Sequence, residues 1–328
     1  MPSINQSFKA HEIADLLGLQ LCGDGDVTVT HVEPLNKAHD SSISFLRGAS
    51  THPYHIGCVI ASQPVDWAQA TLISKNPRSD FSRLLRSVQP PQKATARIHA
   101  TAVIDPKATI ADDVSIGPYS VVGPGVEIGA GVVIGPHCVI EEDVCIGSGS
   151  QLGSHVVLAR SVIIGQRCRI SPQVVIGDDG FTYDKTDEGW QMAPQIGGVV
   201  IGDDVDIGPG TVIDRGFLED TVVSDRCKID ASCMIAHGVK IDSDVLMAAC
   251  TAIAGSTQIG SGCVFGGRSS IINNLIITDN VAIGAVSTVD ADINESGCYI
   301  ARTPLMKKRD WVRKELVIKK LIKGVEHD

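Results

Sequence analysis

The chain has 328 residues, of which 43% are hydrophobic and only 4% aromatic, so we expect a core built from Ile, Val, Leu and Ala. Its formal net charge of −10 argues against a general nucleic-acid-binding protein, which needs a basic face. No segment approaches the roughly 20 consecutive apolar residues of a membrane span, and the N-terminus lacks a signal-peptide pattern, which favours a cytoplasmic protein.

Residues 1–93 predict a small α/β domain. HEIADLLGL (11–19) and SDFSRLLRSV (79–88) are typical of short helices, and DVTVTHVEPL (26–35) and GCVIAS (57–62) are typical of strands. The stretch PPQK at 90–93 is typical of a linker, because proline interrupts regular structure. We therefore expect a domain boundary at residue 93.

Residues 94–300 carry a six-residue repeat. A large apolar residue returns at 29 positions between Ile98 and Val289, interrupted by a loop at 178–199 and by a four-residue slip at FLED (217–220). A small or β-branched residue stands two places before many of these positions, and Gly, Asp or Pro often follows them. Three short strands per coil, stacked about 4.8 Å apart, satisfy this pattern. It predicts a parallel β-solenoid and resembles the hexapeptide-repeat acyltransferases, whose prism is a left-handed β-helix.

The repeat also accounts for half of the ten cysteines. No CxxC pair is present, and the chain is long enough to bury a core without disulfides. A free cysteine behaves as a small apolar side chain, so a structural role is favoured over a catalytic thiol. The cysteines in the small inward slot are Cys138, Cys168, Cys227, Cys233 and Cys263.

Residues 301–328 predict a C-terminal basic helix with an apolar stripe. From Lys307 to Lys323 there are eight basic and two acidic residues, on a chain that is acidic overall. Two interpretations are open: a solvated face that closes an oligomer end, or a docking site for an acidic partner.

His237, in MIAHGVKI, departs from the repeat because the other coils place small or turn-forming residues at that corner. An imidazole can remove a proton from an attacking nucleophile. Gly255 stands 18 residues later, one coil onward, where its backbone N–H could stabilise a developing oxyanion. Asp230, at the preceding corner, is a candidate to orient the imidazole. The alternative is a solvated turn histidine with no chemical role.

His137 and His155 are also 18 residues apart and should stack on one face. A metal pair is one interpretation, but no third histidine falls at a suitable place. We therefore expect no metal site.

Three strings make the resemblance more specific: the loop GDDGFTYDKTDEGWQMAPQIGG (177–198), IDRG (213–216) and KIDASCMIAHGVKI (228–241). Together they resemble the UDP-3-O-acylglucosamine N-acyltransferases of lipid A synthesis. The similarity extends over most of the chain, including ISFL (43–46) and the helix after IARTPL (300–305).

The resemblance implies a homotrimer with active sites between neighbouring solenoids and no cofactor. It implies N-acyl transfer of a 3-hydroxyacyl chain from acyl carrier protein to the 2-amine of UDP-3-O-acylglucosamine. His237 matches the general base, Gly255 the oxyanion-binding backbone and Asp230 the acid associated with the base. Phe45 matches one aromatic that holds the uracil ring of the substrate, and Tyr54 is the candidate for the second.

Two departures from the family pattern bear on substrate and rate. Asn274, a candidate substrate-binding residue, stands where the family has a second histidine, and Met234 stands where it has a glutamine. An amide hydrogen-bonds a phosphate or carbonyl but carries no charge. Two alternatives therefore stay open: an acyltransferase for another UDP-amino sugar, with acyl-CoA or acyl carrier protein as donor, and a divergent paralogue without catalysis.

Overall fold

The computed structural model describes residues 3–48, 55–88, 97–301 and 305–325. Contacts divide the chain into two units, Met1–Lys93 and Ala94–Asp328, which we describe separately. Tyr54 and the predicted linker 90–93 lie outside the described residues.

The N-terminal unit is a six-stranded sheet with the strand order β1-β3-β4-β5-β6-β2, packed against two helices. Helix α1 begins where the Glu12 carboxylate accepts a hydrogen bond from the Lys9 N–H, and it ends at Gly18 in the left-handed conformation. Its apolar face buries Ile13 and Leu17 against the sheet. The elements are β1 (Ser3–Lys9), α1 (Ala10–Leu17), β2 (Gln20–Gly23), β3 (Thr28–Val32), a 3-10 turn (Leu35–Lys37), β4 (Ser42–Phe45), β5 (Ile56–Ala61), β6 (Ala68–Ile73) and α2 (Pro77–Val88).

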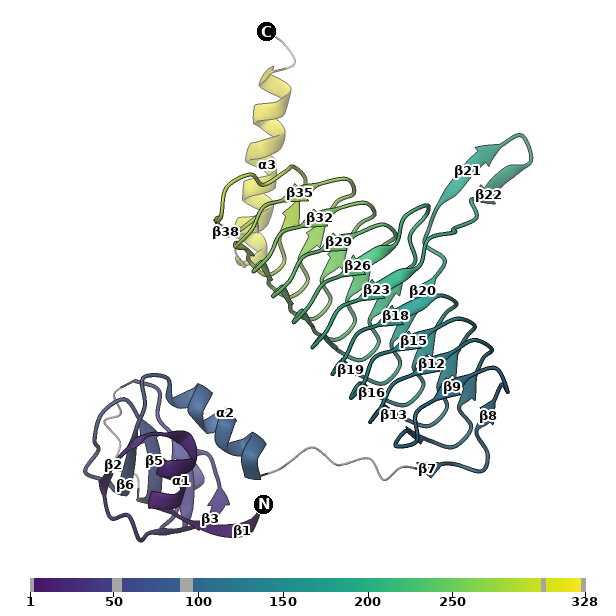
Figure 1. Cartoon of the computed structure of the whole chain (residues 1–328). Helices are drawn as coiled ribbons and strands as arrows, with labels where there is room; N and C mark the ends of the chain where they lie inside the picture. The colour runs from purple at the N-terminus through teal and green to yellow at the C-terminus, as the bar shows by residue number, and fades with distance from the viewer. Residues whose placement is uncertain (1–2, 49–54, 89–96, 302–304, 326–328) are drawn as a thin grey trace. The chain divides into compact units, whose positions relative to one another are not determined.

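The second unit is a parallel β-solenoid with three sheets, which we number in the order in which the chain visits them (Figure 1). Sheet 1 contains β7 (Arg97–Ile98), β10 (Ser115–Ile116), β13 (Val133–Ile134), β16 (Gln151–Leu152), β19 (Arg169–Ile170), β24 (Asp206–Ile207), β27 (Lys228–Ile229), β30 (Leu246–Met247), β33 (Val264–Phe265), β36 (Val281–Ile283) and β38 (Gly297–Tyr299). Sheet 2 contains β8 (Val103–Ile104), β11 (Val121–Val122), β14 (Val139–Ile140), β17 (Val157–Leu158), β20 (Val175–Asp178), β25 (Val212–Asp214), β28 (Met234–Ile235), β31 (Ala252–Ile253), β34 (Ser270–Ile271) and β37 (Thr288–Val289). Sheet 3 contains β9 (Thr109–Ile110), β12 (Glu127–Ile128), β15 (Cys145–Ile146), β18 (Val162–Ile164), β23 (Val199–Ile201), β26 (Thr221–Val223), β29 (Lys240–Ile241), β32 (Gln258–Ile259) and β35 (Ile276–Ile277).

The repeating apolar residues fill the interior of the solenoid as predicted. They pair in register with their equivalents one coil away, as Ile116 does with Ile134. The five cysteines of the small slot are buried and belong to the same core. Burial raises the pKa of each of these thiols, that of Cys227 to about 11, which keeps them in the neutral form. Their role in the core is therefore structural.

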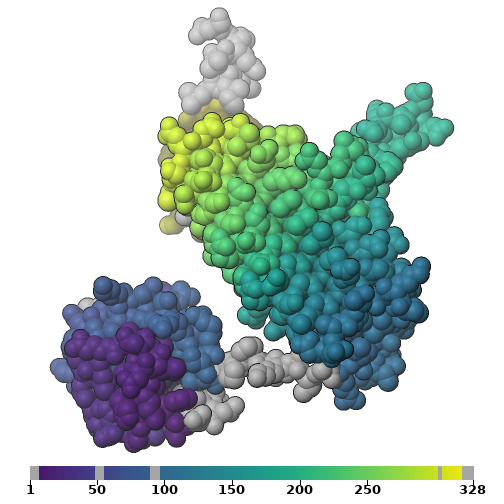
Figure 2. Space-filling view, in the orientation of Figure 1, coloured from purple at the N-terminus to yellow at the C-terminus, as the bar shows by residue number. Residues whose placement is uncertain are grey.

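Two elements depart from the coil pattern. The loop at 178–199 carries an antiparallel hairpin, β21 (Tyr183–Thr186) and β22 (Gly189–Met192), which projects from the solenoid (Figures 1 and 2). Phe181 and Trp190 are among its exposed aromatic residues. The C-terminal helix is α3 (Lys308–Val325), as the sequence predicts. None of the described helices is long and apolar enough to cross a membrane.

Candidate active site

The register of sheet 2 places His237 at one corner of the solenoid. Ile213, Ile235 and Ile253 pair in consecutive coils, so the corner positions that follow them are occupied by Arg215, His237 and Gly255. The Ser256 N–H donates a hydrogen bond of 2.9 Å to the His237 carbonyl, which holds the two coils together at this point. The sequence count of one coil from His237 to Gly255 is therefore reproduced.

The imidazole of His237 is half-buried and lies in space left by two glycines. A Cβ on Gly255 would lie 2.6 Å from Cε1 and 2.7 Å from Nε2 of the ring. A Cβ on Gly180 would lie 2.9 Å from the His237 Cβ and 3.1 Å from Cδ2. A side chain at either position would displace the ring, because real Cβ contacts are not that short. The two glycines therefore fix where the imidazole lies.

Gly255 offers a free hydrogen-bond donor next to this ring. Its carbonyl accepts a 3.0 Å hydrogen bond from the Asn274 N–H, but its own N–H donates to no acceptor among the described residues. An imidazole and an unpaired backbone donor lie side by side, an arrangement that suits acyl transfer.

The loop that carries Gly180 is anchored to the solenoid by the IDRG segment. Arg215 is 3% exposed, and its guanidinium donates hydrogen bonds to the carbonyls of Gly197 at 2.7 Å and Arg160 at 3.4 Å. A Cβ on Gly216 would lie 1.5 Å from a backbone oxygen, so only glycine fits there. This segment therefore holds the end of the loop in place.

Gln195 fixes the Gly180 end of the loop. Its side-chain N–H donates to the Gly180 carbonyl, which presses the Gly180 backbone against His237. The Gln195 side-chain oxygen is buried and has no hydrogen-bond partner among the described residues. Gly180 and Gln195 of this loop thus form one cluster with His237 of the solenoid.

Asp214, at the end of β25, is a buried residue one coil from Ala236, which precedes His237. It is 5% exposed, and its pKa is raised to about 7, first by burial and then by repulsion from the Asp178 carboxylate. No hydrogen bond to its side chain occurs within the described ranges.

The structure does not bring every predicted residue to His237. Asp230 lies at the corner between sheets 1 and 2, is exposed, and accepts a 2.8 Å hydrogen bond from the N–H of Ala231. His237 lies at the corner between sheets 2 and 3, so strand β28 separates the two side chains within this chain. Asn274 is exposed one coil beyond Ser256, and Met234 is a half-buried residue of β28.

Phe45 lies in the other unit, at the end of β4. Its half-buried ring packs against Phe81 with the ring centroids 5.0 Å apart. Tyr54, the second aromatic candidate, falls outside the described residues.

The His137 and His155 rings stack as expected, with centroids 5.0 Å apart and planes only 3° from parallel. Lone pairs of parallel rings do not converge on one ion, because they lie in the ring planes. No group of three metal-binding side chains occurs within the part of the chain that the structure describes.

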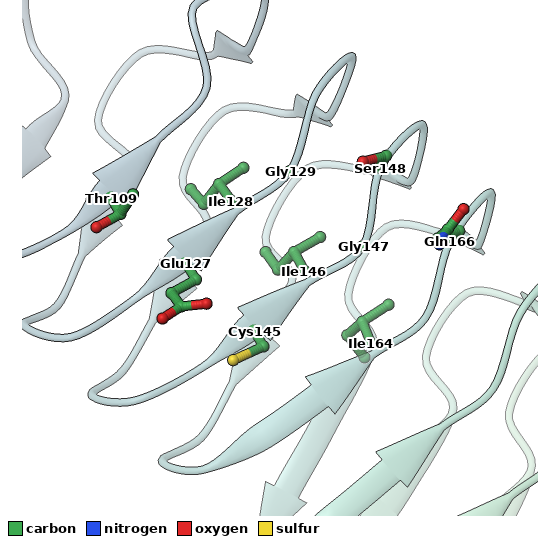
Figure 3. Close-up of a pocket in the computed structure, with 10 residues that line it drawn as sticks. All are labelled: Thr109, Glu127, Ile128, Gly129, Cys145, Ile146, Gly147, Ser148, Ile164 and Gln166. Carbon is green, nitrogen blue, oxygen red and sulfur yellow. The ribbon is translucent and has the colours of Figure 1, made fainter.

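A hollow of about 390 Å³ on sheet 3 lies away from this corner (Figure 3). Glu127 and Cys145 extend from paired strands β12 and β15 on its wall. Burial, then the charges of Glu127 and Asp143, raise the pKa of the Cys145 thiol, which disfavours the thiolate. Cys145 is therefore not an activated nucleophile.

The chain is similar to known proteins over most of its length. Residues 94–185 match the family described as the GMPPB C-terminal domain. Over 327 residues the chain is 35% identical to a UDP-3-O-acylglucosamine N-acyltransferase of Herminiimonas arsenicoxydans, covering 96% of this chain and 93% of that protein. A Delftia acidovorans protein of the same name is 37% identical over 326 residues, covering 94% and 90%.

The chain belongs to the UDP-3-O-acylglucosamine N-acyltransferase family. It is therefore an acyltransferase, as the sequence predicted. Among solved structures, a UDP-N-acetylglucosamine acyltransferase of Francisella novicida shares the fold, with a TM-score of 0.52 and 24% identity over 67% of this chain and 73% of that one. The predicted left-handed parallel β-helix is confirmed.

Sequence reasoning missed three residues near His237. Gly180 and Asp214 lie within strings that the sequence comparison used only as markers, and Gln195 lies within PQIG. Neither the burial of the Asp214 carboxyl nor the packing of Gly180 on the His237 ring produces a periodic pattern in the sequence. The available sign was position: Gly180 and Gln195 lie in the loop that interrupts the repeat, and Asp214 lies shortly before the slip at 217–220.

Proposed function

We propose that the chain transfers a 3-hydroxyacyl group from acyl carrier protein to the 2-amine of UDP-3-O-acylglucosamine. The amine nitrogen attacks the thioester carbon, and His237 removes one proton from that nitrogen. The Gly255 N–H donates a hydrogen bond to the oxyanion of the tetrahedral intermediate. The C–S bond then breaks, an amide forms, and the carrier thiol leaves with the proton that His237 held.

The observation that carries this proposal is the contact between the His237 ring and Gly255. The Nε2 atom of the imidazole is 2.7 Å from where a Cβ on Gly255 would lie, so the ring packs against the residue whose backbone N–H has no acceptor among the described residues. Family membership supports the substrate class, because the relatives are named for acylation of this amino sugar nucleotide.

In this proposal, Asp230 orients His237 only across an interface between two copies of the chain. Since β28 separates it from His237 within one chain, the carboxylate has to come from a second copy. A homotrimer with active sites between solenoids supplies Asp230 of the partner subunit to each His237.

We assign substrate-binding roles to three other predicted residues. Phe45 and Tyr54 hold the uracil ring, and the exposed amide of Asn274 binds substrate near Gly255. The basic residues of α3 attract the acidic carrier protein, since opposite charge speeds encounter. The reaction takes place in the cytoplasm without a cofactor.

Substitution of His237 by Ala tests the assignment. We expect turnover with 3-hydroxyacyl carrier protein to fall by at least about 100-fold, the usual effect of losing a general base. His155→Ala is the matched control, because it removes another corner histidine of the solenoid. Near-normal turnover by the His237 variant would contradict its role.

Mass spectrometry of the product separates the alternatives. Transfer from acyl-CoA, or to another UDP-amino sugar at a higher rate, would favour the alternative substrate that Met234 and Asn274 leave open. Tight binding of UDP sugars without product from any donor would favour a non-catalytic paralogue.

A further inference from the structure

Asp214 is a buried ionisable residue to which the proposed reaction assigns no role. It is 5% exposed, and no side-chain hydrogen bond or ion pair satisfies it within residues 3–48, 55–88, 97–301 and 305–325. Buried carboxylates in folded proteins are normally paired or hydrogen-bonded, because an unpaired one is costly. The Asp214 oxygens are not among the fully enclosed, unpartnered side-chain atoms of the described residues, so they remain open to a ligand.

Arg215, the next residue in the chain, does not form an ion pair with the Asp214 carboxyl. Arg215 directs its guanidinium to the carbonyls of Gly197 and Arg160, and its nearest carboxylate is that of Asp179 at 4.0 Å. Asp178, which pairs with Asp214 across β20 and β25, adds negative charge and so repels it. The local structure therefore gives Asp214 no donor.

The register places Asp214 close to His237 along the solenoid. Ile213 pairs with Ile235, so Asp214 lies one coil from Ala236, the residue that precedes His237. The Gln195 side-chain oxygen, which has no partner among the described residues, also lies near His237. A Cβ on Gly180 would lie 3.2 Å from this oxygen and 3.1 Å from the His237 Cδ2 atom. Gln195 Oε1, the only fully buried side-chain nitrogen or oxygen without a partner among the described residues, thus lies near His237, and Asp214 lies one coil from the residue before it.

We propose that Asp214 binds the reacting amine of the acceptor and selects it over a hydroxyl. This inference rests on the proposed function and extends it. An amine has two N–H bonds, so one can donate to the Asp214 carboxylate while the other gives its proton to His237. The first N–H stays on nitrogen and becomes the amide N–H of the product, so Asp214 neither gains nor loses a proton.

A hydroxyl at the same position cannot satisfy both groups. It has a single O–H, which His237 needs, and its oxygen lone pairs would then face the carboxylate. An unpaired buried acceptor costs the enzyme binding energy, and this is the kind of contact that gives high selectivity. Asp214 is in this view a specificity-determining residue for nitrogen acceptors.

Calorimetry with two probes that differ only at position 2 of the sugar tests the binding step. We expect the wild-type protein to bind UDP-glucosamine at least about 10-fold more tightly than UDP-glucose, the effect of one hydrogen bond to a charged group. Asp214→Asn should abolish that preference and leave the affinity for UDP-glucose within about twofold. Asp187→Asn, at the exposed tip of the hairpin, is the matched control.

Turnover provides the second measurement. Asp214→Asn should lower kcat/KM for UDP-3-O-acylglucosamine by about 10-fold to 100-fold, with the KM for the acyl donor unchanged. Equal probe selectivity and turnover in the variant and wild type would overturn the inference and leave the acyltransferase proposal intact. If the wild type forms no product, the proposed function fails, and the calorimetric preference still decides whether Asp214 reads the amine.

Discussion

The unpaired carboxyl of Asp214 makes a quantitative prediction about stability. Folding raises its pKa from 3.8 to about 7, mainly through burial. A carboxyl whose pKa is higher in the folded state binds its proton more tightly there, so its contribution to stability is greatest below the unfolded pKa. That contribution is lost as the pH rises towards 7, because the unfolded chain releases the proton first.

Integrating this difference gives a loss of about 2–3 kcal/mol between pH 5 and pH 8. Asparagine has the same shape and no titration. The free energy of unfolding of Asp214→Asn, minus that of the wild type, should therefore increase by about this amount over the same interval. Titrations elsewhere in the chain are common to both proteins and cancel in the difference.

Urea unfolding of the full chain, followed by circular dichroism at pH 5 and pH 8, measures this change. The protein concentration must be equal in all samples, since assembly adds to apparent stability. Asp187→Asn should track the wild type at both pH values, because its side chain is exposed. A constant difference between Asp214→Asn and wild type across the interval would refute a buried, unpaired carboxyl at this position.

Three further predictions concern the same unit. Gly255→Ala should reduce turnover by at least about 10-fold with little loss of stability, because its Cβ would displace the His237 ring; steady-state kinetics and thermal unfolding check this. Arg215→Met should destabilise the fold by about 2–3 kcal/mol and speed hydrogen exchange in the loop end, because two carbonyls lose a charged donor. Thiol alkylation at pH 8 should label exposed Cys250 and Cys298 first and reach the core cysteines only after unfolding, as peptide mass spectrometry would show.

The solenoid could be predicted from sequence because its physics is periodic. Each coil contacts only its neighbours, so one rule for the inward position applies from Ile98 to Val289. The same regularity located His237 as an exception and Gly255 as its neighbour one coil away. Both placements agree with the structure, because the register of sheet 2 continues through this corner without a slip.

The contacts made by the interruptions could not be predicted in this way. Gly180 and Gln195 belong to the loop at 178–199, and nothing periodic relates their positions to His237. The structure shows that this loop folds back to the corner, where the Gly180 backbone packs on the imidazole. A local sequence reading also cannot reveal that the Asp214 carboxyl lacks a partner, since that depends on where Arg215 directs its donors.

The residues of the IDRG segment have different roles. Arg215 and Gly216 are accounted for by the fold: one donates to two carbonyls, and the other leaves no room for a Cβ. Asp214 is the opposite case, because burial without a donor lowers the stability of the folded state at neutral pH. The two adjacent residues therefore have different reasons to be present. The arginine anchors the end of the loop, and in our proposal the carboxyl receives its hydrogen-bond donor from the acceptor amine.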